Sequence, residues 1–192
     1  MVFRVSRREL VGAGLVLAVP LPARADTGFV IDWQGGEQAP EIAAALAAQI
    51  ALVEGLAISE AAMAFFRSQV ITVDRERGTR TRAGPRGIFF ERRAVPADNP
   101  VLLHELIHRY QLERMPDGQR NADVHRFYDA AVRERQFRPD SYMMTNAFEF
   151  FAMAASVVLY GRAERPPYLR DNVRRRAPEL YRFIVREFGF RG

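Results

Sequence analysis

The segment that most constrains the fold is residues 141–161, because it contains a single charged residue. That residue is Glu149. Around it the side chains are apolar on nearly every side of a helix: Phe148, Phe150, Phe151, Ala152, Val157, Val158 and Leu159. A helix of this kind is buried, so other elements must surround it. A carboxylate buried there needs a cation, either a metal ion or one of the many arginines.

Local patterns outside this segment indicate an α+β fold. Alternating or β-branched runs predict strands at residues 28–33, 70–73 and 87–92. Apolar spacing predicts helices at residues 40–56, 59–68, 100–115, 122–136, 145–160, 168–176 and 178–188. Ser59 and Asn99 are the expected caps of the second and third helices, with Pro100 in the first helical position of the third. Residues 75–87, rich in glycine and arginine, are predicted to form a loop or an irregular hairpin tip. The strands therefore lie in the N-terminal half, and the C-terminal half is all helical.

The first 25 residues have the features of a removable export signal. A basic start precedes an apolar stretch of 13 residues, and a small-residue cleavage site, Ala23-Arg24-Ala25, follows. The apolar stretch is too short to span a bilayer core of about 30 Å as a helix. Arg7 and Arg8 resemble a bacterial twin-arginine signal, and a general secretory signal is the alternative. We therefore expect a periplasmic or secreted protein with one mature domain, residues 26–192, and no transmembrane anchor.

Composition excludes several kinds of site. The chain has no cysteine, which rules out thiol nucleophiles, thiolate zinc sites and iron–sulfur clusters. All 28 basic residues are arginine, and four of them lie in the export segment with one acidic residue. The expected mature domain therefore has 24 arginines and 22 acidic residues, a net charge of +2. So small an excess of positive charge does not predict nucleic-acid binding.

His104, Glu105 and His108 follow the pattern His-Glu-x-x-His within the helix predicted at residues 100–115. Side chains four residues apart lie on one face of a helix, one turn above the other. Two imidazoles at this spacing can bind one zinc ion, with the glutamate placed beside a water at the metal. The bland alternative is a pair of partly exposed histidines on an amphipathic helix. The chain has only three histidines, so the spacing favours the metal site.

A catalytic zinc ion takes three protein ligands and leaves one position for water. A longer motif with glycine at position 111 and histidine at position 114 is excluded, because those positions hold Gln111 and Arg114. His125 and Glu134 are possible third ligands. Glu149 is the better candidate, because a carboxylate in its apolar helix needs a cation.

Residues 141–152 then show a resemblance to a known family. They read Ser-Tyr-Met-Met-Thr-Asn-Ala-Phe-Glu-Phe-Phe-Ala. This resembles the second signature of the anthrax lethal factor catalytic domain, which is Ser-Tyr, two residues, Thr-Asn, two residues and Glu-Phe-Phe-Ala. As in that family, the His-Glu-x-x-His motif lies some forty residues upstream, and Glu149 is 41 residues after His108. The resemblance covers roughly residues 89–188.

The resemblance implies a zincin-like fold, with a small N-terminal sheet packed on the helix that carries His-Glu-x-x-His. It also implies a zinc metalloendopeptidase of the gluzincin type. Zinc would be bound by His104, His108 and Glu149. Glu105 would be the general base, and Tyr142 would assist at the transition state. The expected partner is a peptide or protein substrate, and the expected state is a monomer.

One departure from the family pattern bears on activity. The family usually has an acidic residue four positions after the glutamate ligand, where it supports a zinc-bound histidine. Here that position is Met153, and Asn146 is a candidate replacement. A non-catalytic protein-binding module with a degraded site is therefore the main alternative. A zinc-storage protein is a third, although we find no convincing fourth ligand.

Residues 87–92 raise a separate question about substrate binding. This strand is either the edge of the sheet, onto which an extended peptide could add as a further strand, or an ordinary core strand. The sequence leaves both readings open.

Overall fold

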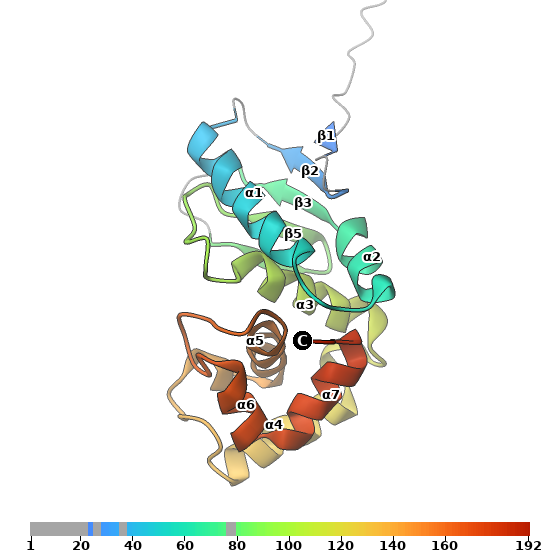
Figure 1. The fold of residues 1–192 in the computed structure, drawn as a ribbon, viewed down its shortest axis with the longest axis vertical. Coiled ribbons are helices and arrows are strands. Elements are labelled where there is room, and N and C mark those ends of the chain that lie inside the picture. Colours follow the sequence, from blue (N-terminus) through green and yellow to red (C-terminus); the bar gives the residue numbers. More distant parts are fainter. Residues whose placement is uncertain (1–22, 25–27, 35–37, 76–79) are drawn as a thin grey trace, which may run out of the picture.

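A mixed β-sheet runs through the N-terminal half of the chain (Figure 1). The computed structural model describes residues 23–24, 28–34, 38–75 and 80–192. The strands are β1 (Ala23–Arg24), β2 (Val30–Trp33), β3 (Val70–Val73), β4 (Arg82–Gly84) and β5 (Gly87–Phe90). Their order is β1-β2-β3-β5-β4, with β2, β3 and β5 parallel and the two outer strands antiparallel to their neighbours. The predicted α+β class is confirmed.

The centre of the sheet is held by two strands of strongly apolar sequence. Ile71 and Val73 of β3 pair in register with Ile88 and Phe90 of β5. All four side chains are fully buried. β-branched and aromatic residues suit a pleated surface of this kind, because they pack against neighbours across the strands.

The strand at residues 87–90 is not an edge strand. It pairs with β3 on one side and with β4 on the other, so an extended peptide cannot add to it. The edge is β4, which falls within the segment predicted as a loop or hairpin tip. A tight turn joins β4 to β5, and Gly87 completes it with a φ of 119°, a conformation that side-chain-bearing residues rarely adopt.

Two helices connect β2 to β3, and both begin as the sequence predicts. α1 (Pro40–Glu54) has proline in its first turn, and α2 (Glu60–Ser68) is capped by the Ser59 hydroxyl, which accepts a hydrogen bond from the Ala62 amide at 3.2 Å. α3 (Val101–Arg114) begins differently. Pro100 occupies its cap position, and Asn99 does not cap it. The buried amide of Gln49 in α1 does this instead, because its oxygen accepts from the Leu102 amide at 3.1 Å.

The C-terminal half is helical, as predicted. It contains η1 (Gly118–Arg120), α4 (Ala122–Arg133), η2 (Tyr142–Met144), α5 (Ala147–Tyr160), α6 (Arg170–Arg176) and α7 (Pro178–Phe188). α5 lies at its centre, in contact with α3, α4, α6 and α7 (Figure 1). Residues 150–159 are all buried, which confirms the expectation drawn from their apolar sequence.

Two backbone hydrogen bonds join the C-terminal end of the chain to the loop between α1 and α2. The Ser59 amide donates to the Phe188 carbonyl at 2.8 Å, and the Arg191 amide donates to the Ala57 carbonyl at 2.9 Å. The end of the chain therefore packs between the two halves, as the position of its label in Figure 1 shows.

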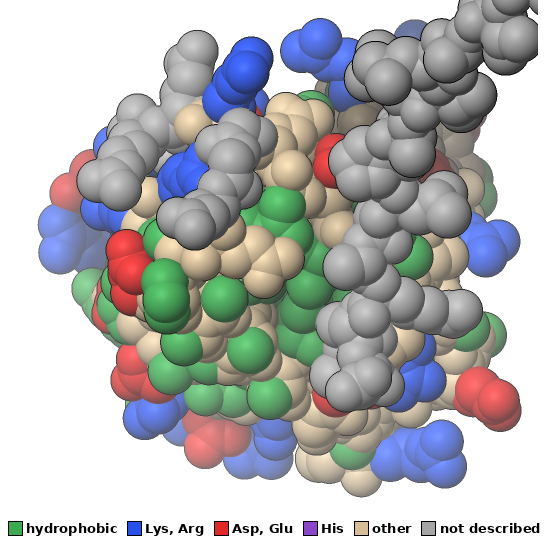
Figure 2. Space-filling view, turned by 90° about the horizontal axis from the view of Figure 1, so that it is seen from above, with side chains coloured by type: hydrophobic (Ala, Val, Ile, Leu, Met, Phe, Trp, Pro, Cys, Tyr) green, Lys and Arg blue, Asp and Glu red, His purple; other side chains and the backbone are tan. Residues whose placement is uncertain are grey.

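The predicted export segment lies outside the described residues, except for the two residues of β1. None of the helices in the described part of the chain combines the length and apolar character needed to cross a bilayer. Seen from above (Figure 2), arginine and acidic side chains are interspersed over the surface, and no histidine is visible on that face.

Candidate metal centre

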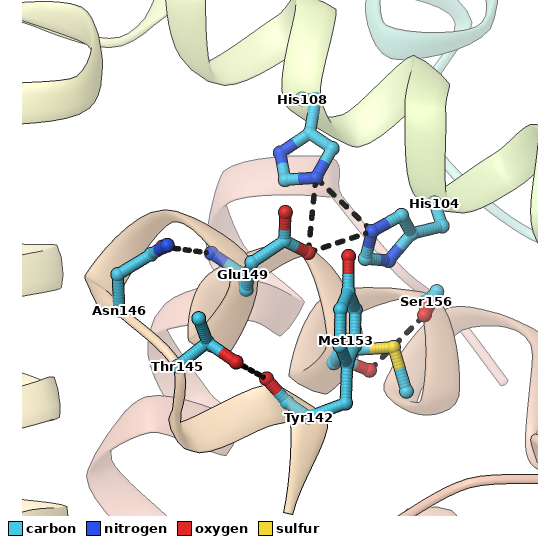
Figure 3. A network of polar contacts seen from close by, with 8 residues as sticks. All are labelled: His104, His108, Tyr142, Thr145, Asn146, Glu149, Met153 and Ser156. Carbon is cyan, nitrogen blue, oxygen red and sulfur yellow. Dashed lines mark hydrogen bonds and ion pairs between the residues drawn. The ribbon is translucent and has the colours of Figure 1, made fainter. Parts of the chain in front are cut away.

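Two helices from different halves of the molecule bring three metal-binding side chains together (Figure 3). His104 and His108 project from successive turns of α3, and Glu149 projects from the first turn of α5. The Nε2 atoms of the two histidines are 3.0 Å apart. Oε2 of Glu149 lies 3.1 Å from Nε2 of His104 and 3.4 Å from Nε2 of His108. The three ligand atoms thus converge on one point.

The turn before α5 fixes the direction of Glu149. Asn146 caps the helix, and its side-chain oxygen accepts from the Glu149 amide at 2.8 Å. The Thr145 hydroxyl donates to the Tyr142 carbonyl at 2.7 Å and closes η2 (Figure 3). These bonds explain the Thr-Asn pair of the sequence signature. They also correct the expectation for Asn146, whose side-chain oxygen caps α5 and supports no histidine.

The group could hold a metal ion, because its ligand atoms all lie within 4.8 Å of one another. Burial lowers the pKa of His108 to about 4, so its ring is neutral at pH 7 and offers a lone pair. Burial opposes ionisation of Glu149, but contacts with His104 and His108 outweigh it and hold the pKa of Glu149 below its usual range. Imidazole nitrogens and a carboxylate oxygen suit several divalent transition metals. The donor set therefore fits a metal ion.

The two other residues weighed as third ligands lie elsewhere. His125 is exposed, and its Nε2 atom contacts the Gln119 carbonyl at 3.0 Å. Glu134 is also exposed, and it pairs with Arg133 at 2.8 Å. Neither belongs to the group formed by the two α3 histidines and Glu149.

Glu105 lies next to this group and has the environment of a base that works near neutral pH. Its side chain is only 6% exposed. Burial raises the pKa of Glu105 to about 7, against the opposing charge of His104 and a hydrogen bond with the backbone of Ala83 in the edge strand β4. A carboxylate with a pKa near the working pH can both accept and return a proton.

Tyr142 also lies beside the group. Its side chain is 40% exposed, and in Figure 3 its hydroxyl points towards Glu149 and His104. Burial, followed by the charge and hydrogen bond of Glu149, raises the pKa of Tyr142 to about 12. The hydroxyl therefore keeps its proton at neutral pH and can donate a hydrogen bond. The Arg165 guanidinium lies over the ring, 5.3 Å from its centre.

The histidines lack the support that metal-binding imidazoles usually have. Nδ1 of His104 and Nδ1 of His108 are both buried without a hydrogen-bond partner. Met153, one turn after Glu149, offers no acceptor for either of them and is itself buried (Figure 3). The departure noted in the sequence thus coincides with two buried Nδ1 atoms that no group of the described chain accepts from. Ligand histidines normally donate this second N–H to a carboxylate, carbonyl or water.

A cavity of about 650 Å³ opens beside the group. His104, Glu105 and Tyr142 line it, together with Met153 and Ser156 of α5. Five charged residues beyond the motifs also line it: Arg80, Glu91, Arg93, Glu164 and Arg165. Of these, only Arg80 belongs to a segment that the sequence singles out: the arginine-rich loop at residues 75–86 could contact an acidic substrate, although a solvated loop is the favoured reading. The others had no sequence signal, because only the fold brings their segments together.

Comparisons with protein families, with curated proteins and with solved structures found no match to this chain.

Proposed function

We propose that this chain is an exported zinc metalloendopeptidase of the lethal factor type. The observation that carries the proposal is the convergence of three ligand atoms, from His104, His108 and Glu149, beside a cavity of about 650 Å³ that His104 also lines. Glu105 and Tyr142 flank the same point. The two sequence signatures support the assignment, because their residues meet at this one place.

The chain's own residues divide the chemistry between them. A zinc ion bound here would polarise the scissile carbonyl and make a water acidic enough to attack it. Glu105, with a pKa of about 7, accepts the proton of that water and returns it to the leaving amine. Tyr142, with a pKa of about 12, donates a hydrogen bond to the oxygen on which negative charge develops.

A non-catalytic binding module on the same scaffold is the second candidate. The unpartnered Nδ1 atoms of His104 and His108 favour it, because loss of such support weakens metal binding or activity typically by 10–100-fold. Intact Glu105 favours the peptidase, since a binding module has no use for a buried carboxylate with a raised pKa.

Metal content and cleavage together test the proposal. The purified protein should contain about one equivalent of zinc and cleave members of an unbiased peptide library. Glu105→Gln should retain the metal and lose roughly 10²–10⁴-fold in cleavage rate. Glu134→Gln, which changes an exposed glutamate outside the group, is the matched control and should keep both properties. Full activity in Glu105→Gln, or after exhaustive chelation, would refute a metallopeptidase.

A further inference from the structure

The cavity beside the metal-binding group has an uneven charge. Five charged side chains line it besides Glu105: Arg80, Glu91, Arg93, Glu164 and Arg165. Glu91 is buried, and its carboxylate pairs with Arg93 and contacts the Thr81 hydroxyl at 3.4 Å. This carboxylate and one guanidinium are therefore already neutralised by each other.

The remaining charges favour an anion. Glu164 accepts a hydrogen bond from the neutral amide of Asn99 at 3.2 Å. Arg80 and Arg165 line the same cavity, and neither forms an ion pair with any residue of the described chain. Apart from Glu105, which lies beside the metal-binding group, two guanidiniums thus line the cavity without a carboxylate partner, against one glutamate without a cation.

Of these two arginines, Arg165 is the one that contacts a residue beside the metal-binding group. Its guanidinium stacks on Tyr142, whose hydroxyl points to Glu149. The loop that carries it is closed by hydrogen bonds from the Tyr168 amide to the Arg165 carbonyl at 2.9 Å and from the Ala163 amide to the Tyr168 carbonyl at 2.8 Å. A hydrogen-bonded turn therefore positions the Arg165 guanidinium over the Tyr142 ring, and that ring separates it from the metal-binding group.

We propose that the cavity binds a carboxylate of the peptide substrate close to the scissile bond, and that Arg165 is the residue that selects it. The inference rests on the peptidase function proposed above. An arginine fork binds a carboxylate through charge-assisted, often paired hydrogen bonds. A lysine or arginine side chain of the substrate would meet two uncompensated guanidiniums in the same space. The carboxylate comes either from an aspartate or glutamate side chain or from the substrate's C-terminus.

Matched peptides test the selection. One cleavable sequence is varied to Glu, Gln or Lys at the positions flanking the scissile bond, and each peptide is made with a free and an amidated C-terminus. The Glu peptide should exceed the Gln peptide by roughly 10- to 100-fold in kcat/KM, the range expected for a hydrogen bond to a charged group. A preference among amidated peptides identifies the side chain as the source. A preference for free over amidated ends identifies the C-terminus.

Variants of the arginine assign the preference to one residue. Arg165→Gln should abolish it, and Arg165→Glu should reverse it in favour of Lys. Arg162→Gln is the control, because Arg162 is an exposed residue of the same loop that pairs with Asp98 and does not line the cavity. The proposal is overturned if the Glu, Gln and Lys peptides are all cleaved equally, whether their C-terminus is free or amidated. It is also overturned if a preference for the carboxylate survives in Arg165→Gln.

Binding separates this inference from the peptidase function. The same peptides are titrated into the Glu105→Gln protein by calorimetry. If carboxylate peptides bind preferentially and wild-type protein cleaves none of them, the cavity inference stands and the peptidase proposal fails. If the wild-type protein cleaves peptides, but neither binding nor cleavage depends on a carboxylate, the peptidase proposal stands and the cavity inference fails. No binding and no cleavage of any peptide overturns both.

Discussion

Glu105 and Glu149 are the same residue type, but their environments shift their pKa values in opposite directions. Burial dominates at Glu105 and raises its pKa to about 7, so the proton can come and go near neutral pH. At Glu149 the neighbouring imidazoles outweigh burial and hold the pKa low, so the carboxylate stays charged and available as a ligand. When the environment shifts the pKa values of two carboxylates in opposite directions, one can serve as a base and the other as a charged ligand.

Tyr142→Phe removes one hydroxyl and tests the role given to it. If the hydroxyl donates to developing negative charge, kcat should fall about 10²–10³-fold while KM and zinc content stay the same. The ring is 40% exposed, so the free energy of unfolding should change little. Tyr168→Phe, at a tyrosine that is 49% exposed, is the control and should leave kcat unaltered. An unchanged kcat in Tyr142→Phe would show that the tyrosine is only structural.

Met153→Glu tests whether the missing hydrogen-bond acceptor for the ligand histidines weakens metal binding. A carboxylate one turn after Glu149 would give the buried, unpartnered Nδ1 of His104 an acceptor. Zinc affinity should then rise, typically by about 10–100-fold. Competition with a chelator of known affinity measures the change, and Met153→Leu, which preserves the volume without an acceptor, is the control. An affinity of Met153→Glu equal to that of the control would place the weakness of the site elsewhere.

At the scale of elements, Arg109 ties the motif helix to the edge of the sheet. It follows His108 directly on α3 and is 9% exposed. Its guanidinium donates to Gln69 at 3.0 Å, to the Gly84 carbonyl of β4, and pairs with Glu113 on its own helix. β4 is the strand whose Ala83 backbone bonds to Glu105. One arginine therefore holds the edge strand at the distance from α3 that this contact needs.

Arg109→Leu should destabilise the protein by about 3–5 kcal/mol, the usual cost of removing one partner of a buried charged cluster. The Gly84 carbonyl and the Gln69 amide would lose their donor while remaining largely covered. Urea denaturation followed by circular dichroism measures the loss. Arg120→Leu, at an exposed arginine, should stay within about 0.5 kcal/mol of the parent. Equal effects of the two substitutions would contradict the role of Arg109.

The elements that the sequence predicts well are those whose signals are local. Ser59 caps α2 and Pro178 begins α7 as expected, because each acts within one turn of its own helix. The start of α3 was predicted wrongly in detail, since its cap comes from Gln49, 53 residues away. β4 was missed for the same reason, because a strand of three residues exists only through its pairing with β5.

The same division applies to the candidate site. The spacing of His104, Glu105 and His108 within one helix is visible in sequence, and the apolar surroundings single out Glu149. The arrangement of α3 against α5, which brings these residues together, is tertiary and has no local signal. The role of Arg165 is even harder to predict from sequence, because nothing in its loop sequence indicates that it lines a cavity.

At the scale of the whole molecule, the candidate site lies on the boundary between the two halves. α3 follows the sheet and contributes two ligands, whereas α5 is the centre of the helical half and contributes the third (Figures 1 and 3). A metal ion bound there would connect the halves at their largest contact. Without a cation, the Glu149 carboxylate depends on its contacts with the two imidazoles for compensation.

Metal binding should therefore stabilise the folded chain as one unit. A ligand that binds only the folded state adds about 2.7 kcal/mol at a free concentration one hundred times its Kd. For a chain of this length each kcal/mol raises Tm by about 2–4 °C, so zinc should raise Tm by about 5–10 °C over the chelated protein. Glu149→Gln removes the ligand supplied by the helical half and should abolish most of the shift, whereas His125→Ala should keep it, because His125 lies on the surface outside the group. Scanning calorimetry with zinc and with chelator measures all three proteins, and a shift of equal size in Glu149→Gln would mean that the metal binds without joining the two halves.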